Sequence, residues 1–409
     1  MTTIETECCI VGGGPAGIVA GYLFARAGVN TVVLEKHRDF LRDFRGDTVH
    51  PSTLEIMHEL GLAEALLKRP HQKLRRPAGV FGGKRYQIAD LDHLPTRYDF
   101  IAFMPQWEFL DFLSDEAKRL SAFSLRMNSE VVDLIEENGR IAGVRAVTPE
   151  GPLDVRAKLT IGADGRHSTA RAKSGLQVTD IGAPIDVFWF RVARDPAPVS
   201  AEDSLLYAGK SQIVVTIDRG DYWQCAYVIP KNGAEKVRAA GLDAFKAAAA
   251  ATAPHLSAHI GDVASWDDVK LLTVVIDRLE KWSRPGFVCI GDSAHAMSPI
   301  GGVGINLAVQ DAVAAANLLA AKLAAGQLRD TDLDGVRKRR LFPTRITQFM
   351  QVQVQNFVLG PIIGGKQREQ KPPLAMRIIA RVPWLQRKVA LLFGLGVRPE
   401  HVRSPLARH

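Results

Sequence analysis

The feature that most restricts the fold of this chain is a glycine-rich turn near its N-terminus. An apolar segment, Cys8 to Val11, leads into Gly12-Gly13-Gly14-Pro15-Ala16-Gly17, and a helical pattern of small residues follows. The glycines therefore fill a G-x-G-x-x-G motif between a predicted strand and a predicted helix. In this motif the first glycine allows the tight turn, the second lets the backbone approach a pyrophosphate, and the third lets the helix pack closely on the strand.

A second predicted strand, Thr31 to Leu34, ends in Glu35, which lies eighteen residues after Gly17. An acidic residue at about this distance binds a ribose hydroxyl in βαβ nucleotide-binding units. The N-terminus of the intervening helix offers unpaired N–H groups and a partial positive charge to phosphates. This stretch therefore predicts a dinucleotide site that comprises Gly12, Gly14, Pro15, Ala16, Gly17, Glu35 and Lys36.

The 409 residues are 46% apolar and 23% charged, which is typical of a globular protein. A chain of this length can form the cores of two or three domains. The longest apolar stretch, Ile305 to Leu323, is interrupted by polar side chains, so no membrane-spanning helix is expected. The acidic N-terminus does not have the form of a secretory signal, and we expect a cytoplasmic location. The four cysteines lie in apolar segments without metal-ligand spacing, which predicts buried thiols and no metal site.

Positive charge is concentrated at the C-terminus. Residues 341–409 contain eleven Lys or Arg and two Glu, an excess of +9 that accounts for the whole net charge of +8. Such a tail can attract an anionic partner, but no nucleic-acid-binding module accompanies it, so no nucleic-acid partner is expected. Between Met376 and Leu395, apolar and basic residues alternate around Pro383. Two interpretations stay open: weak contact with a membrane surface, or helices packed against the nucleotide-binding lobe.

Two further motifs have the form of strand, turn and helix. One is Gly162-Ala163-Asp164-Gly165-Arg166-His167-Ser168, and the other begins at Gly291-Asp292-Ser293-Ala294-His295 and continues to Asn306. Both place an aspartate and exposed N–H groups at the end of a predicted strand, where a nucleotide would lie. Between the first motif and these two, a helix is expected from Pro51-Ser52-Thr53 to Leu67, with Ser52 or Thr53 as the cap and Glu55 at capping-box distance from Ser52.

With these three motifs in order, the chain resembles the flavin-dependent aromatic hydroxylases, the single-component FAD monooxygenases similar to p-hydroxybenzoate hydroxylase. The resemblance extends from about Cys8 to Ala325. It implies a mixed α/β fold in which a Rossmann-like FAD-binding lobe is interleaved with a β-sheet substrate lobe, followed by C-terminal helices. We expect the FAD lobe in residues 1–75, 101–180 and 277–340, the substrate lobe in 76–100 and 181–276, and a basic helical region in 341–409.

The resemblance also assigns roles to cofactor-binding residues. Gly12, Gly14 and Gly17 would hold the FAD pyrophosphate, Glu35 the adenosine ribose, and Asp292 the ribityl hydroxyls. Asp164 and Gly165 would serve both FAD and the passing NAD(P)H. The remaining implied contacts to FAD are Arg45, Gln106, Val131, Pro299, Gly302, Gly304, Ile305 and Asn306. The glycine-rich turn before the helix that starts near Ile305 has a physical purpose, because its N–H groups and dipole can stabilise negative charge on a reduced flavin.

The implied reaction is a hydroxylation. NAD(P)H reduces FAD, oxygen adds to give a flavin hydroperoxide, and one oxygen atom passes to an electron-rich substrate. No catalytic acid or base is evident, and His167 and His295 are interpreted as structural loop histidines. The aromatic-rich strands between Asp186 and Pro230 predict an apolar aromatic substrate, such as a phenol, a polyketide-like polycycle or a quinol. Substrate candidates are Trp189, Arg191, Tyr207, Tyr222, Tyr227, Pro299 and Gly301.

Alternation along the strand at 187–192 places Val187, Trp189 and Arg191 on one face and the intervening residues on the other. The sequence leaves open which face meets the flavin, and each aromatic candidate competes with a role in the core. It also leaves open the choice between NADH and NADPH and the oligomeric state.

Three other functions remain as alternatives. A flavin-dependent halogenase has a W-x-W-x-I-P signature, and the segment Cys225 to Pro230 preserves only its Ile-Pro end. An isoprenoid reductase would share the FAD motifs. A flavin-bound protein that binds a membrane surface or a partner would use the basic tail. Gain of an oxygen atom by the product separates the hydroxylase from these alternatives.

Overall fold

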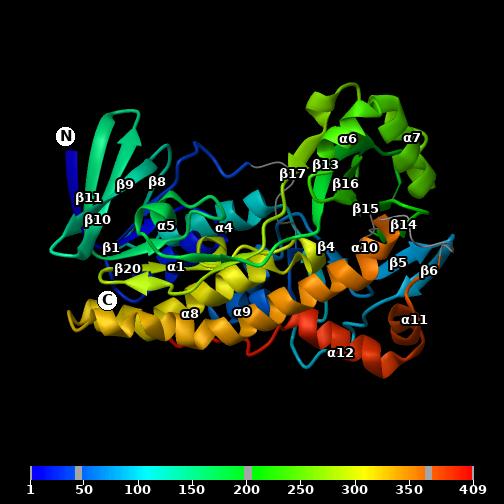
Figure 1. Ribbon diagram of the computed structural model, residues 1–409. Coiled ribbons are helices and arrows are strands. Elements are labelled where there is room, and N and C mark those ends of the chain that lie inside the picture. The colour runs from blue at the N-terminus through cyan, green and yellow to red at the C-terminus, as the bar shows by residue number, and fades with distance from the viewer. Residues whose placement is uncertain (1, 42–47, 198–204, 364–370, 408–409) are drawn as a thin grey trace.

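The computed structural model describes residues 2–41, 48–197, 205–363 and 371–407, which form two sheet-based lobes joined by long helices (Figure 1). The first lobe contains an eight-stranded sheet. Its strands are β19 (Ser283–Arg284), β20 (Phe287–Cys289), β11 (Gly151–Gly162), β1 (Thr2–Val11), β2 (Thr31–Leu34) and β8 (Phe123–Arg126) in spatial order, with β10 (Arg140–Thr148) beside β11 and β9 (Glu130–Glu137) beside β10. The neighbours from β20 to β8 are parallel.

Three helices pack side by side against the buried parallel strands. They are α1 (Pro15–Arg26), α4 (Gln106–Lys118) and α8 (Gly304–Ala324), with α1 between the other two. A Cβ atom on Gly21 would lie 2.7 Å from Val33, so a glycine is required for α1 to approach β2 this closely. The strands and helices share one continuous apolar core, which sets the ends of β1, β11 and β20 at a common edge of the sheet.

The second lobe is built on a seven-stranded sheet. In spatial order it contains β17 (Lys270–Leu272), β13 (Ile185–Ala193), β16 (Tyr222–Pro230), β15 (Ile213–Asp218), β14 (Leu205–Ala208), β5 (Ala78–Phe81) and β6 (Lys84–Gln87). Helices α6 (Ala234–Ala239) and α7 (Leu242–Thr252) cover one face, where Phe188, Phe190 and Phe245 pack together. The opposite face contributes Val187, Ala226 and Val228 to a second apolar cluster.

Shorter elements connect the lobes. They are β3 (Thr48–Val49), β7 (Ile101–Phe103) and β4 (Gln72–Leu74) in one small sheet, β12 (Val178–Asp180) and β18 (Asp277–Leu279) in another, and α5 (Thr169–Lys173). Short 3-10 turns lie at Pro254–Leu256, Ile260–Asp262, Trp266–Asp268, Gly291–Ser293, Ile300–Gly302 and Asp330–Asp332. Segments far apart in sequence thus contribute to each lobe, and the predicted fold class, a Rossmann-like lobe interleaved with a β-sheet lobe plus C-terminal helices, is confirmed.

The helix expected from Pro51-Ser52-Thr53 to Leu67 is two helices, α2 (Pro51–Glu59) and α3 (Ala63–Leu66), separated at Gly61, where φ is +74°. The capping-box prediction is wrong. His50 is the N-cap and Pro51 takes the first helical position, where its missing N–H costs nothing. The carboxylate of Glu55 instead accepts hydrogen bonds from the Thr96 hydroxyl and from the backbone N–H of Arg97.

The C-terminal helices pack against both lobes. They are α9 (Asp334–Val354), a π-helical turn (Gln355–Leu359), α10 (Gly360–Ile363), α11 (Leu374–Arg381) and α12 (Pro383–Gly394). In Figure 1, α9 runs beside α8 and continues towards α10, which contacts β16. The final segment returns to the first lobe, where the Ala407 N–H donates to the Arg26 carbonyl over 2.9 Å. Within the described chain one segment, Ile300–Ala324, has the length and composition of a membrane span, and 83% of an 18-residue apolar window within it is buried inside the protein.

Candidate cofactor and substrate site

The glycine turn after β1 has the geometry that its sequence predicts. Gly12 has φ of +101°, and a Cβ atom on Gly17 would lie 1.8 Å from the carbonyl oxygen of Gly12. At Gly14, the N-cap of α1, an added Cβ would meet no atom within 4 Å, and no side chain caps this helix. Because the open space adjoins an uncapped helix N-terminus, the turn fits a pyrophosphate group.

Glu35 lies beside this turn at the end of β2. Its carboxylate accepts hydrogen bonds from the Gly13 N–H at 2.8 Å and from the His37 N–H at 3.1 Å. The segment leading into β9 adjoins the same place, because the Ser129 N–H donates to the Glu35 carbonyl at 2.8 Å. Val131 is buried two residues further along, and Lys36 is exposed. The residues expected around the adenosine are therefore assembled from β2 and β9.

The second and third motifs meet at the edge of the first sheet, because β11 and β20 are neighbours. Arg166 forms an ion pair with Asp292 at 3.7 Å, so side chains of the two motifs are in contact. The Asp164 carboxylate accepts hydrogen bonds from the Ser168 hydroxyl and from the Ala170 N–H at the start of α5. Burial raises the pKa of Asp164. A Cβ at Gly165, where φ is +83°, would meet nothing within 4 Å.

The loop from Pro299 to Val303 leads directly into α8. Gly301 and Gly302 have φ of +76° and +62°, and a Cβ on Gly301 would lie 2.6 Å from the ring of Phe393. Gly304 begins α8 with open space around it, and the first turn has neither a side-chain cap nor an acidic residue. Ile305 is buried in the same turn. This second uncapped N-terminus can stabilise negative charge on a ligand.

Asn306 braces this loop against the start of α2. Its side-chain oxygen accepts hydrogen bonds from the His50 N–H at 3.0 Å and the Thr53 hydroxyl at 2.7 Å, and its amide nitrogen donates to the Gly302 carbonyl at 3.3 Å. The Thr48 hydroxyl donates to the same carbonyl at 2.7 Å. These contacts hold the shape of the loop, a role that the sequence did not reveal for Asn306.

His50 was missed by sequence reasoning because its partners are distant in the chain. Its Nδ1–H donates to the Phe393 carbonyl at 2.7 Å, which ties α12 to the start of α2. Burial lowers the pKa of His50 to about 4, so the imidazole is neutral at neutral pH. Its role could not be predicted from a local motif, because a histidine before a proline is not typical of any particular site.

A network of buried charged side chains contacts the Gly291–Asp292 turn. Asp311 on α8 accepts hydrogen bonds from His295 Nε2 at 2.6 Å, from the Gly291 N–H at 3.0 Å and from Arg340 Nε at 2.9 Å. Burial would raise the pKa of Asp311, but the positive charges and hydrogen bonds of His295 and Arg340 outweigh it and hold the pKa below its usual value. His295 therefore has a structural environment, and His167 is exposed.

The second sheet separates the substrate candidates by face. Trp189 packs in the apolar cluster that includes Ile300 of the loop before α8, and Arg191 lies over the ring of Tyr222 at 4.9 Å. Tyr207 and Tyr227 lie on the opposite face, where Tyr227 packs 4.9 Å from the Phe245 ring of α7. Helix α7 packs on the face that carries Tyr207 and Tyr227, whereas Trp189 lies on the face towards Ile300.

Gln106 and Arg45 are also predicted to bind the cofactor. Gln106 is the first residue of α4 and is partly exposed after the Met104-Pro105 turn. Arg45 falls outside the described residues, so its predicted role stays a prediction.

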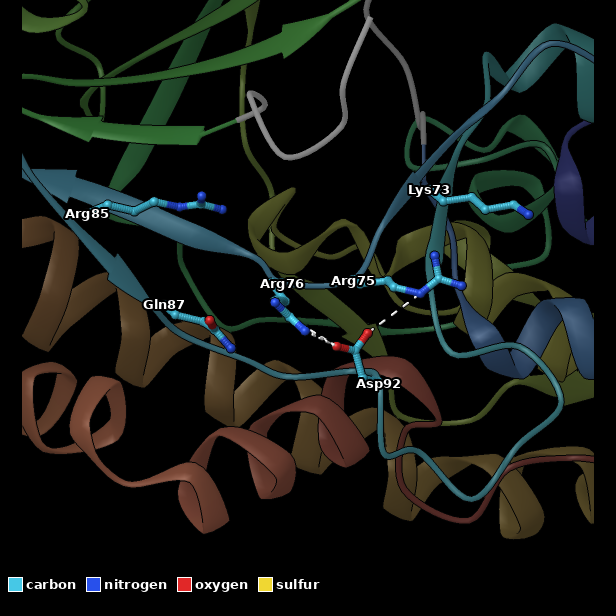
Figure 2. Close-up of a pocket in the computed structure, with 6 residues that line it drawn as sticks. All are labelled: Lys73, Arg75, Arg76, Arg85, Gln87 and Asp92. Carbon is cyan, nitrogen blue, oxygen red and sulfur yellow. Dashed lines mark hydrogen bonds and ion pairs between the residues drawn. The ribbon is translucent and has the colours of Figure 1, made fainter.

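A cationic cleft of about 660 Å³ opens beside β4, β5 and β6. Figure 2 shows Lys73 and Arg85 on opposite sides of it, with Asp92 between Arg75 and Arg76. Asp92 pairs with Arg76 at 2.6 Å and with Arg75 at 3.5 Å. Four cations therefore line the cleft with one carboxylate. The sequence did not indicate this cluster, because the cations come from two strands, β4 and β6, and from the loop after β4.

The residues present fit FAD: a pyrophosphate cradle at Gly14, a ribose acid at Glu35, and an uncapped helix N-terminus at Gly304 at the same sheet edge. The class is thus a flavoprotein with a dinucleotide-binding lobe. The family model for the FAD binding domain matches residues 5–350, and the chain belongs to the FAD-dependent aromatic monooxygenases of the p-hydroxybenzoate hydroxylase type. It is a FAD-dependent monooxygenase and hence an oxidoreductase, as the sequence predicted.

Individual relatives agree with this assignment. The 6-methylpretetramide 4-monooxygenase of Streptomyces rimosus is 30% identical over 407 residues, which cover 98% of this chain and 95% of that protein. The structure of p-nitrophenol 4-monooxygenase from Pseudomonas putida matches with a TM-score of 0.72 and 22% identity over 96% of this chain and 98% of that chain. A myxobacterial chondrochloren halogenase matches with a TM-score of 0.74 and 18% identity over 99% of this chain and 100% of that chain, which shows a shared fold.

Proposed function

We propose that this monooxygenase uses NAD(P)H and O2 to hydroxylate an apolar aromatic or quinol-type small molecule. The observation that carries the proposal is the apolar face of the second sheet, where Val187, Trp189 and Ala226 cluster with Ile300 of the loop before α8. An apolar wall next to the cofactor-binding turn suits an aromatic ring with few charges. The name of the Streptomyces relative, 6-methylpretetramide 4-monooxygenase, is consistent with such a substrate.

When bound, FAD supplies the electron transfer and the activation of oxygen. The chain would position the cofactor: Gly14 and the N-terminus of α1 would hold the pyrophosphate, and Glu35 would hold the ribose. The N–H groups at the start of α8 would stabilise negative charge on the ring. Neutral His50 holds α12 against the start of α2 without adding a charge. The apolar sheet face excludes water from the reacting centre.

Rapid mixing tests the proposal. The FAD-bound enzyme is mixed anaerobically with NADH or NADPH, alone and with a panel of phenols, naphthols and quinols, and the flavin absorbance is followed. We expect bleaching that one class of compound accelerates, followed by hydroxylated product after oxygen is admitted. Reduction by neither nicotinamide, with or without a compound, would contradict the proposed electron donor.

The cationic cleft in Figure 2 supports NAD(P)H as the donor, because phosphates are attracted to Lys73, Arg75, Arg76 and Arg85. We expect Arg85→Glu to raise the KM for the nicotinamide by about 10-fold, in line with the loss of a charge-assisted contact. FAD affinity should stay unchanged in this variant. Lys236→Glu, at an exposed position of α6, makes the same change in net charge away from the cleft and is the control.

Halogenation and isoprenoid reduction remain alternatives on the same fold. The chondrochloren halogenase has a similar fold, but the Cys225–Pro230 segment of this chain still lacks both signature tryptophans. Product mass distinguishes the three reactions. A hydroxylase adds oxygen, a halogenase adds the halide supplied in the buffer, and a reductase adds only hydrogen.

A contact between the C-terminal helices and an anionic membrane surface is a further proposal, together with a cytoplasmic location. Leu374 and Trp384 are 68% and 62% exposed, and no acidic residue lies between Lys371 and Arg398. Flotation with phosphatidylserine vesicles should carry the enzyme upward, and a double variant with Leu374→Ser and Trp384→Ser should not float. Flotation of neither protein would contradict the contact.

A further inference from the structure

Gln355 is a fully buried side chain in the π-helical turn between α9 and α10. Neither its side-chain oxygen nor its side-chain nitrogen has a hydrogen-bond partner within the described chain. An orphaned buried amide is costly, because both polar atoms have lost water without replacement. The rare π-helical turns of proteins often occur at functional sites. A residue of this kind calls for a ligand that satisfies it.

Its neighbours along the helix place Gln355 between the loop before α8 and the second sheet. One turn earlier, Gln351 Nε2 donates to the carbonyls of Ser298 at 2.9 Å and Ile300 at 3.0 Å. One turn later, Leu359 packs in the cluster that contains Val187 and Ile300. Residues four apart share a helix face, so Gln355 lies on the face directed at both structures.

Local backbone chemistry explains the widened turn. The Gly360 N–H donates to the Gln355 carbonyl, the i to i+5 bond of a π-helix. Pro361 follows, and it has no N–H with which to continue an ordinary helical ladder.

We propose that Gln355 is a specificity-determining residue that binds the polar edge of the aromatic substrate. Its Nε2 donates to an acceptor and its Oε1 accepts from a donor that lie side by side on the substrate. A carboxamide on the ring and a phenol next to a carbonyl group both present this pair. The inference rests on the proposed aromatic substrate, and it adds the chemistry of the substrate edge.

Binding to the FAD-loaded enzyme, followed by the perturbation of the flavin spectrum, tests the pairing. The probes are 2-naphthamide against methyl 2-naphthoate, and 1-hydroxy-2-acetonaphthone against its methyl ether. Each pair differs by loss of the donor. We expect the donor-bearing member of at least one pair to bind about 10-fold more tightly, and Gln355→Met to abolish that preference. The pair that shows the preference identifies which of the two edges the enzyme recognises.

Thermal unfolding separates recognition from a structural role. Methionine matches the length of glutamine and removes the orphaned amide, so the Tm of substrate-free Gln355→Met should rise by about 1–3 °C. Gln351→Met is the matched control one turn away. It deprives two loop carbonyls of their donor, and its Tm should fall. A fall of Tm in both variants, or an unchanged probe preference in Gln355→Met, would overturn the inference.

The outcomes also separate this inference from the proposed function. If no naphthalene probe perturbs the flavin of the wild-type enzyme, the apolar aromatic substrate class fails and the role of Gln355 fails with it. If the probes bind but neither pair shows a preference, or the preference survives Gln355→Met, the substrate class stands and only the role of Gln355 is rejected.

Discussion

The cofactor cradle and the substrate-facing sheet bind their ligands by different means. The cradle around Gly12, Gly17 and Gly304 offers backbone N–H groups and space, and its geometry depends on the absence of side chains. The sheet face around Trp189 and Ala226 offers side chains from strands distant in sequence. A site that binds its ligand through backbone N–H groups can therefore be predicted from a short sequence motif. A site that binds through side chains depends on how the whole chain folds.

The largest effect should come from filling the cradle. In Gly17→Val the new Cβ would lie 1.8 Å from the Gly12 carbonyl oxygen, with no flexible neighbour to move. We expect a loss of more than about 4–5 kcal/mol of unfolding free energy and no bound FAD. Absorbance at the flavin band and chemical denaturation measure both.

Gly14→Ala is the matched control, because an added Cβ there meets nothing within 4 Å. Its stability should change by less than about 1 kcal/mol, while FAD binding weakens by about 10-fold as the methyl group enters the pyrophosphate space. If Gly17→Val retained FAD, the claim that the cofactor-binding turn depends on its glycines would be contradicted.

The next largest effect tests whether the Gly291–Asp292 turn depends on the buried side chains that contact it. Arg340→Met leaves the buried Asp311 carboxylate short of a charge partner, and we expect a loss of about 3–5 kcal/mol in unfolding free energy. Lys338→Met on the same helix removes an exposed pair with Asp334 and should cost less than about 0.5 kcal/mol. If urea denaturation gives equal losses of unfolding free energy for the two variants, the buried network stabilises the protein no more than an exposed ion pair does.

A pH dependence follows from His50. Its pKa falls from 6.5 to about 4 on folding, so protonation favours the unfolded chain. The unfolding free energy is therefore complete above about pH 6.5 and decreases by up to about 3 kcal/mol as the pH falls to 4. Denaturation at a series of pH values should show a shallower decrease for His50→Gln. The exposed His167→Gln should keep the wild-type slope, and an unchanged slope in His50→Gln would contradict the assignment.

The smallest effect concerns the faces of the second sheet. Trp189→Ala removes an aromatic wall near Ile300 and should weaken binding of the 2-naphthamide probe by about 10-fold, since an aromatic contact contributes roughly 0.5–1.5 kcal/mol beyond its buried area. Tyr227→Phe alters the face against α7 and should leave that affinity unchanged. Comparable losses in both variants would mean that the substrate does not distinguish the faces.

The sequence predicted the fold and family from local patterns. Glu35 could be placed beside the glycine turn because both belong to one βαβ unit of fixed geometry. The alternation of Trp189 and Phe190 also predicted that they lie on opposite faces. It could not say which face α7 would cover, because that depends on a helix more than fifty residues later.

Residues with distant partners were beyond local reasoning. His50 meets Phe393 and Gln351 meets Ile300 through the packing of the C-terminal helices, which no motif describes. The capping prediction at Glu55 failed because Pro51 started the helix and Thr96 supplied another partner. Isolated glutamines such as Gln355 carry no signal until burial removes their solvent.

The most direct measurement is isotopic. The FAD-bound enzyme is supplied with NAD(P)H, the aromatic compound that most accelerates flavin reduction, and 18O2 in unlabelled water, and the product is weighed by mass spectrometry. A monooxygenase with this site should place one labelled oxygen atom on the ring, and the yield should fall in Trp189→Ala. A product that is unlabelled, halogenated or merely reduced would contradict the account.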